Sequence, residues 1–167
     1  ILVYPGTYTS TGPPIVVDIP NKQIELRSVC GPNATIIDGE GANTCVWVQW
    51  GNTTSTIVEG FKIINGWGFA GAGIHCQGDA TIDGCVISYN NAQSSGAGIF
   101  CHDAFITGCT ISNNTAGDYG GGIQIQQGTG CIVRDCTVVG NYGANTGGGI
   151  SVMSDVWISS CLISDNS

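Results

Sequence analysis

The segment Gly71-Ala72-Gly73-Ile74 decides the fold, because close copies of it recur along the chain. The copies are Gly96-Ala97-Gly98-Ile99, Gly120-Gly121-Gly122-Ile123 and Gly147-Gly148-Gly149-Ile150. Their isoleucines are 25, 24 and 27 residues apart. A second element follows each copy and runs from a cysteine to an asparagine: Cys85 to Asn90, Cys109 to Asn114, Cys136 to Asn141 and Cys161 to Asn166. Two elements that recur in one register predict a repeat architecture whose units stack on their neighbours.

Each repeat contains short alternating segments of three to five residues, separated by Gly, Asn, Asp and Ser. Alternation indicates strands and these separators indicate turns, whereas helix-length amphipathic patterns do not occur in the sequence. A 24–27-residue repeat made of strands predicts an all-β parallel β-helix with coils stacked about 4.8 Å apart. About six coils of 24–28 residues fit the chain. The earlier, weaker copies are Gln23 to Arg27, Thr35 to Asp38, Cys45 to Gln49 and Glu59 to Gly66.

Alternation also sorts the repeated positions into columns that point into the solenoid or out of it. We expect the interior columns to be Ile74, Ile99, Ile123 and Ile150; Cys76, Cys101, Ile125 and Val152; Ile82, Ile106, Val133 and Ile158; and Cys85, Cys109, Cys136 and Cys161. A further column consists of Asn90, Asn114, Asn141 and Asn166. Its regular register predicts an asparagine ladder at a turn, with side-chain amides bonded along the stack.

The repeats resemble the right-handed β-helix repeat family, whose architecture is shared with pectate lyases. They are also similar to the repeats of polymorphic outer-membrane proteins, which combine a GGA-I motif with an F-x-x-N motif. The counterparts here are Gly-x-Gly-Ile and Ile-x-x-Asn, as in Ile87 to Asn90. The opening Val3 to Tyr8 resembles the start of many secreted bacterial β-helix proteins. The resemblance implies a single-stranded right-handed parallel β-helix with bacterial-type secretion, and it is specific for the fold rather than for one activity.

Composition excludes two kinds of partner. Twelve acidic against four basic residues give a net charge of -8, and the basic residues form no cluster, which argues against nucleic acid. No apolar run approaches the roughly 20 residues that span a bilayer. We expect residues 1–167 to form one β-helix domain, complete or part of a longer solenoid, with the regular repeats at 57–167. The nine cysteines leave at least one thiol unpaired, and disulfides and free thiols both remain open.

Two outward columns suggest a ligand-binding face. The first contains Trp47, His75, Phe100, Gln124 and Ser151, and the second contains Gln49, Gln77, His102, Gln126 and Met153. Aromatic rings stack on the C–H faces of sugars, while amides bond to hydroxyls, so this face is predicted to contact a glycan. The alternative is a strand surface filled with β-forming and neutral polar residues.

A third outward column is apolar and contains Ile57, Thr81, Phe105, Ile132 and Trp157. An exposed apolar stripe often marks an interaction surface. We therefore predict association through Ile57, Phe105, Ile132 and Trp157, with coverage by a loop or a neighbouring chain as the related alternative.

Acidic residues also recur in register. Asp79 and Asp103 precede equivalent strands, and stacked carboxylates favour a bound cation such as calcium, although aspartate is also a common turn residue. No other cofactor is expected. Glu59 and Asp83 stack in another column with Arg134, but this arrangement departs from a lyase site, and surface acids explain it as well.

The sequence therefore favours a non-enzymatic structural or adhesin-like β-helix, outside the cell or at its surface. Its expected partners are other copies of itself or the remainder of a longer solenoid, together with glycans, and end-to-end stacking of copies would give fibres. The alternative is a carbohydrate-binding or polysaccharide-degrading β-helix of the lyase or hydrolase type.

Overall fold

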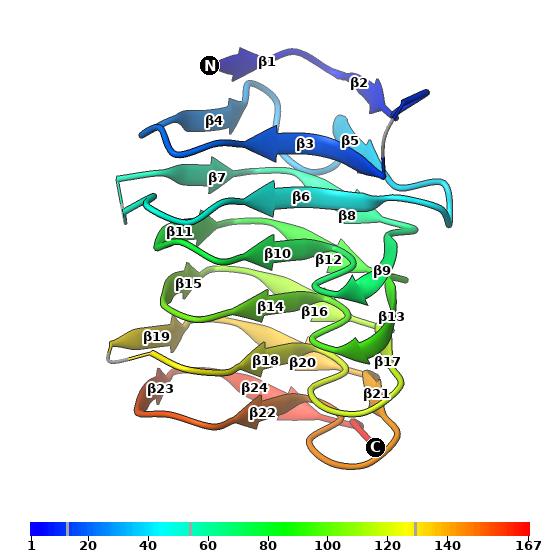
Figure 1. Ribbon diagram of the computed structural model, residues 1–167, viewed down its shortest axis with the longest axis vertical. Coiled ribbons are helices and arrows are strands. Elements are labelled where there is room, and N and C mark those ends of the chain that lie inside the picture. The colour runs from blue at the N-terminus through cyan, green and yellow to red at the C-terminus, as the bar shows by residue number, and fades with distance from the viewer. Residues whose placement is uncertain (13, 54, 129) are drawn as a thin grey trace.

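The computed structural model describes residues 1–12, 14–53, 55–128 and 130–167. Within these ranges every regular element is a strand, and the strands stack in parallel into a solenoid of about six turns (Figure 1). The two chain ends lie at opposite ends of the stack. The prediction of an all-β parallel solenoid is confirmed. No helix in the described ranges is long and apolar enough to cross a membrane.

Two seven-stranded sheets form two faces of the solenoid. Sheet A contains, in order, β1 (Leu2–Val3), β4 (Glu25–Ser28), β7 (Ile57–Glu59), β11 (Ala80–Asp83), β15 (Ala104–Thr107), β19 (Cys131–Arg134) and β23 (Val156–Ser159). Sheet B contains β2 (Gly6–Tyr8), β5 (Thr35–Asp38), β8 (Lys62–Ile64), β12 (Val86–Ser88), β16 (Thr110–Ser112), β20 (Thr137–Val139) and β24 (Leu162–Ser164).

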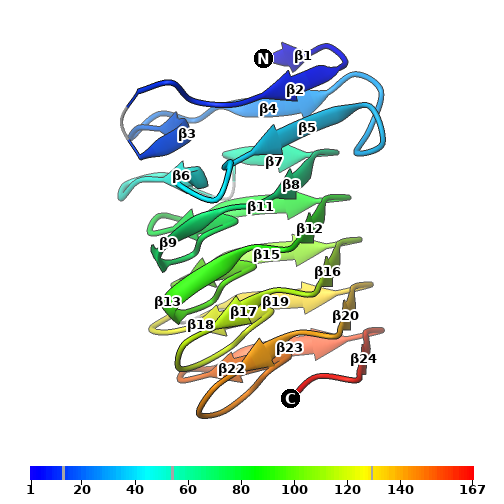
Figure 2. The same ribbon diagram turned by 90° about the vertical axis from the view of Figure 1, so that its right-hand side faces the viewer.

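The remaining strands form a six-stranded and a four-stranded sheet. Sheet C contains β3 (Ile15–Ile19), β6 (Thr44–Val48), β10 (Ile74–Cys76), β14 (Ile99–Cys101), β18 (Ile123–Ile125) and β22 (Ile150–Val152). Sheet D contains β9 (Trp67–Ala70), β13 (Asn91–Ser95), β17 (Thr115–Ala116) and β21 (Tyr142–Gly143). Figure 2 views the solenoid from the side on which sheet D stacks.

The strands pair in the register that the repeats predict. In sheet C, Ile74 pairs with Ile99, Ile99 with Ile123, and Ile123 with Ile150. The first three of these isoleucines are fully buried, as are Ile82 and Ile106 of sheet A and Ile87 and Ile111 of sheet B. Burial of branched side chains in continuous columns supplies the main stabilisation of the fold, at about 1.5–3 kcal/mol for each side chain.

The last described coil differs from this pattern. Val152 and Ile158, which were expected to point into the interior, are 39% and 40% exposed. Their strands, β22 and β23, lie at the edges of sheets C and A, so no further coil covers them. The prediction that these two side chains are buried is therefore wrong, although their register is as expected.

The predicted asparagine ladder is present at the corner after sheet B. The Oδ1 atom of Asn114 accepts bonds from the backbone N and from Nδ2 of Asn90, both at 3.0 Å. Asn114 in turn donates to Oδ1 of Asn141 from the same two atoms, at 3.0 and 2.9 Å. Each Nδ2 also donates to a carbonyl on the sheet B strand of the preceding coil, as from Asn114 to Ile87 at 3.0 Å. The ladder thus links each coil to the next through buried side chains.

The glycines of the repeat motif allow the chain to fold back on itself between sheets D and C. Gly71 and Gly96 have φ values of 63° and 59°, in the left-handed region that favours glycine. A Cβ atom at Gly96 would lie 2.8 Å from Cα of Phe100, which is too close for any side chain. The turn therefore lies directly against the outer face of sheet C.

Candidate functional site

Three aromatic rings stack along the outer face of sheet C. Trp47, His75 and Phe100 occupy paired positions on β6, β10 and β14. The ring centroids of Trp47 and His75 are 4.8 Å apart, with 29° between the ring planes. Those of His75 and Phe100 are 5.0 Å apart, at 30°. The ring spacing follows the spacing of the strands, so the predicted column is a continuous aromatic ladder parallel to the solenoid axis.

Amides and a second histidine border this ladder. Nε1 of Trp47 donates to Oε1 of Gln77 at 3.3 Å. Nε2 of Gln49 donates to the carboxylate of Asp18, at 2.8 and 3.0 Å to its two oxygens. The ring of His102 lies edge-on to Phe100, with centroids 5.7 Å apart. The structure thus brings these predicted residues of the two columns together on one face.

The face contains two adjoining hollows. The first, of 320 Å³, is lined by Ile15, Trp47, Gln49, Trp50 and Gln77. The second, of 290 Å³, is lined by Phe69, Ala70, His75, Gln77, Ser94, Ser95, Phe100, His102 and Gln126. Gln77 borders both, so they form one groove, which we call the aromatic groove. Sheet C forms its floor, and β9 and β13 of sheet D form one wall.

Two exposed aromatic residues of this groove do not follow from the repeat. Trp50 is 59% exposed, and its ring lies 4.8 Å from that of His102. Phe69, which lies on β9, is 73% exposed. Trp50 follows the end of a strand, where alternation no longer indicates a direction. The only sequence signal for either residue is a large apolar side chain next to a turn.

The expected exposure of Gln124 is wrong. Its side chain is 1% exposed, and its Nε2 donates to the carbonyl of Ile125 at 3.2 Å. The turn at Gly120 lies over it, since a Cβ at Gly120 would be 2.9 Å from the backbone N of Gln124. Phe100 is also largely covered, at 8% exposed. The open part of the groove therefore involves Trp47, Trp50, His75 and Phe69 more than the covered residues.

His75 has a defined protonation state in the groove. Burial lowers the pKa of His75 below its ordinary value of 6.5, and the nearby His102 contributes in the same direction. Nδ1 lies 2.8 Å from the carbonyl oxygen of Ala70, which can only accept a hydrogen bond. At neutral pH the ring is therefore uncharged with its proton on Nδ1, and Nε2 is left as an acceptor.

The groove carries little charge. Among the described residues that line its two hollows, none is Lys, Arg, Asp or Glu. The nearby carboxylate of Asp18 is bonded to Gln49. The groove thus offers rings, amides, hydroxyls and a neutral imidazole, which suit an uncharged ligand with both apolar and hydroxyl surfaces.

The predicted association column lies on sheet A. Ile57, Thr81, Phe105, Ile132 and Trp157 pair in register along β7, β11, β15, β19 and β23. Trp157 is 69% exposed and the others are half-buried. A hollow of 540 Å³ over this sheet is lined by Asp79, Thr81, Asp103, Ala104, Phe105, Gly130 and Ile132. The acidic pair and the apolar column therefore share one surface.

The acidic pair has local partners. Oδ1 of Asp103 accepts a bond from the backbone N of Gly130 at 3.1 Å. Partial burial, and then the charge of Asp103, raises the pKa of Asp79. In the described ranges, no group of three or more His, Cys, Asp or Glu side chains is placed to hold a metal ion. Calcium at Asp79 and Asp103 stays a prediction, and the structure shows two candidate ligand side chains for it.

Two residues that were considered for a lyase-type site, Glu59 and Arg134, are engaged in other contacts. Glu59 pairs with Asp83 in register, but its carboxylate forms an ion pair with Arg27. The guanidinium of Arg134 lies 4.9 Å from the ring centroid of Phe105, and its Nε is 3.5 Å from the carboxylate of Asp135. Glu59 and Arg134 are thus each part of a surface ion pair.

Comparison with known proteins identifies the fold family of the chain. No curated protein and no solved structure matched it. A family model described as the right-handed beta helix region matches residues 32–167, which is most of the chain. The resemblance inferred from the repeats is thereby confirmed, and the chain belongs to the right-handed β-helix family.

Proposed function

We propose that this protein is a non-enzymatic, adhesin-like β-helix that binds glycans through the aromatic groove, outside the cell or at its surface. The observation that supports the proposal best is a groove bordered by amides, in which Trp50 and Phe69 expose their rings beside the ladder of Trp47, His75 and Phe100. Aromatic faces pack on the C–H surfaces of sugar rings, and glutamine side chains can both donate to and accept from hydroxyls.

The direction of the groove favours a linear ligand. Equivalent side chains repeat every 4.7–4.9 Å or so along the axis, which is the spacing of strands in a sheet. Trp47 and His75 occupy successive coils, and Trp50 and Phe69 are exposed beside them, so an oligosaccharide parallel to the axis meets rings on more than one coil. Such a repeat of weak contacts gives affinity through the length of the glycan rather than through one deep pocket.

The charge of the groove favours a neutral glycan over an acidic one. Uronic acids carry carboxylates, whose binding relies on Lys or Arg, and the described lining residues include neither. The whole chain carries a net charge of -8, which repels polyanions further. We therefore expect neutral hexose oligomers to bind more tightly than oligogalacturonates of the same length.

Binding is tested by calorimetric titration with neutral and uronic oligosaccharides of matched length. We expect Trp50→Ala and Trp47→Ala to weaken binding of the neutral oligomer by about tenfold each, since stacking of one ring contributes about 1 kcal/mol or more. Trp157→Ala is the matched control, because Trp157 is also exposed but lies on sheet A. Unchanged affinity in both groove variants, or an equal loss in the control, contradicts the proposal.

A second candidate function is assembly of copies into fibres. The last described coil exposes Leu162, Ile163 and Trp157, at 60%, 47% and 69%. Apolar side chains at unpaired strand edges favour the addition of another coil, from a second copy or from the remainder of a longer solenoid. Electron microscopy across a concentration series tests this: rods one solenoid wide in the native protein, lost in Leu162→Asp, support it. Dispersed particles at every concentration contradict it.

A further inference from the structure

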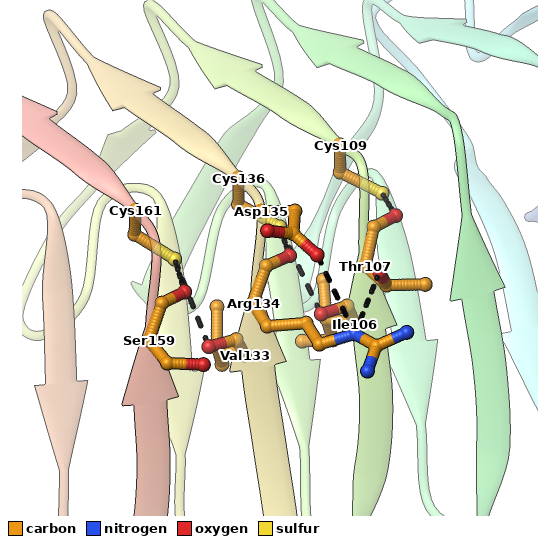
Figure 3. Close-up of polar contacts among 9 residues, drawn as sticks. All are labelled: Ile106, Thr107, Cys109, Val133, Arg134, Asp135, Cys136, Ser159 and Cys161. Carbon is orange, nitrogen blue, oxygen red and sulfur yellow. Dashed lines mark hydrogen bonds and ion pairs between the residues drawn. The ribbon is translucent and has the colours of Figure 1, made fainter.

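Four cysteine side chains form a buried column at the corner between sheets A and B, which we call the thiol column. Its members are Cys85, Cys109, Cys136 and Cys161, all of them free thiols. The first three are at most 2% exposed, and Cys161 is half-buried. Phe61 occupies the equivalent position on the coil before Cys85, so the column has a definite first member. Figure 3 shows three of these cysteines on successive coils.

The backbone holds the column in register. Each cysteine follows a residue in the left-handed conformation, namely Gly84, Gly108, Asp135 and Ser160. The carbonyls of Cys85, Cys109 and Cys136 each accept a bond at 2.9 Å from the residue after the next cysteine: Thr110, Thr137 and Leu162. Adjacent cysteines are therefore separated by one coil, about 4.7–4.9 Å for parallel strands. Figure 3 shows the side chains of Cys109, Cys136 and Cys161 pointing in the same direction.

This spacing suits one chemistry of paired thiols better than another. A disulfide needs Cβ atoms about 3.5–4.5 Å apart, so it would require two coils to be pinched together. A metal–thiolate bond is about 2.3 Å long, so a linear sulfur–metal–sulfur unit spans about 4.6 Å. A two-coordinate ion therefore fits between successive coils without moving them.

The surroundings of the sulfurs favour a cation. Sγ of Cys136 lies 3.0 Å from the carbonyl oxygen of Arg134 and 3.8 Å from that of Ile106 (Figure 3). Cys161 has the same arrangement with Ser159, at 3.1 Å, and Val133, at 3.6 Å. Carbonyl oxygens next to each sulfur stabilise a positive ion between the thiols and disfavour an isolated thiolate.

We propose that the thiol column binds monovalent soft metal ions of the copper(I) class, one ion between the sulfurs of each pair of successive coils. Soft thiolate ligands select such ions over harder divalent ones. When three ions enter the gaps between four thiols, four protons are released and an M₃(SR)₄ unit of charge -1 is formed. The interior thus gains one net charge in place of four thiolates, which limits the cost of desolvation.

Entry of the ions begins at the more accessible end of the column. Cys161 is half-buried, whereas Cys85 and Cys109 are each 1% exposed. The first ion is therefore expected between Cys136 and Cys161.

The test is native mass spectrometry of the reduced protein titrated with silver(I), in excess glutathione to remove ions held by a single thiolate. Cys109 borders two gaps, so Cys109→Ser is expected to retain two fewer ions than the unaltered protein. Cys161 borders one gap, so Cys161→Ser is expected to retain one fewer. Cys45→Ser is the control, because Cys45 is a buried thiol outside the column, and it is expected to retain the full number.

Equal losses in Cys109→Ser and Cys161→Ser would mean that each thiol binds its own ion, and no loss in either would mean that the column binds none. Both results overturn the proposal. A measurement on the unaltered protein does not depend on folding of the variants: X-ray absorption of the copper(I)-loaded form is expected to show two sulfur neighbours for each ion. Three or four sulfur neighbours, or intact disulfides after loading, also overturn it.

Discussion

The asparagine ladder and the thiol column lie at the two ends of the same strands of sheet B, and they differ in how completely their polar groups are used. Both place one buried residue on each coil in strict register. Asn114 takes part in bonds with Asn90, Asn141 and Ile87, through its side chain and its backbone N. Cys109 offers one weak donor, which lies near two carbonyl oxygens. The asparagine ladder therefore stabilises the stack through hydrogen bonds, whereas the thiol column is packed but makes only weak hydrogen bonds.

The largest effect is expected from Asn114→Ala. The substitution removes the side-chain bonds to the backbone N of Asn90 and to the carbonyl of Ile87, and Oδ1 of Asn141 loses one of its two donors. Each unsatisfied buried group costs about 1–3 kcal/mol, so we expect a loss of about 3–5 kcal/mol in the free energy of unfolding. Urea denaturation followed by circular dichroism measures it. Asn145→Ala is the control on an exposed asparagine bonded to Asp118, with an expected change below about 0.5 kcal/mol.

A smaller effect is expected from Cys109→Ala. It removes one buried sulfur and a weak hydrogen-bond donor. The two carbonyl oxygens near the thiol lose only this weak bond. We expect a loss of about 1 kcal/mol by the same denaturation assay, mostly from the cavity. If Cys109→Ala destabilises the protein as much as Asn114→Ala, the two corners are equivalent and the distinction between them fails.

The smallest effect concerns the groove and depends on pH. The pKa of His75 is lowered by burial, so below its ordinary value of 6.5 the unfolded chain binds a proton that the folded protein does not. The contribution of His75 to stability therefore falls as pH drops below about 6.5, until the folded pKa is reached. Unfolding temperatures at pH 7.5 and 5.0 measure this change. His75→Phe keeps a ring in the ladder but does not titrate, so its loss between the two pH values is expected to be smaller.

The strand register could be predicted from the sequence because equivalent residues recur once in each coil. The spacing of Ile74 and Ile99 gives the coil length directly, and Asn90 and Asn114 lie at a corner where their identity matters to the next coil. Alternation also places His75 on the outer face. These properties are local to one coil or to its nearest neighbour.

The covering of the groove could not be predicted in the same way. Alternation tells which side of a strand a residue faces, but not what lies over that side. Gln124 points outward and is still buried, because the turn at Gly120 folds back over it. Phe69 and Trp50 reach the groove from outside the repeated strands of sheet C, so their positions depend on tertiary packing.

The asparagine ladder has a consequence for how such a chain can evolve and be engineered. Oδ1 of the asparagine on each coil accepts bonds from the asparagine of the preceding coil, with nearly the same geometry between Asn90 and Asn114 as between Asn114 and Asn141. Any coil is therefore an acceptable neighbour for any other. Duplication of a segment that encodes 24 residues adds a coil without the need for a new interface at this corner. The length of the molecule is thus set by the number of copies of the repeat.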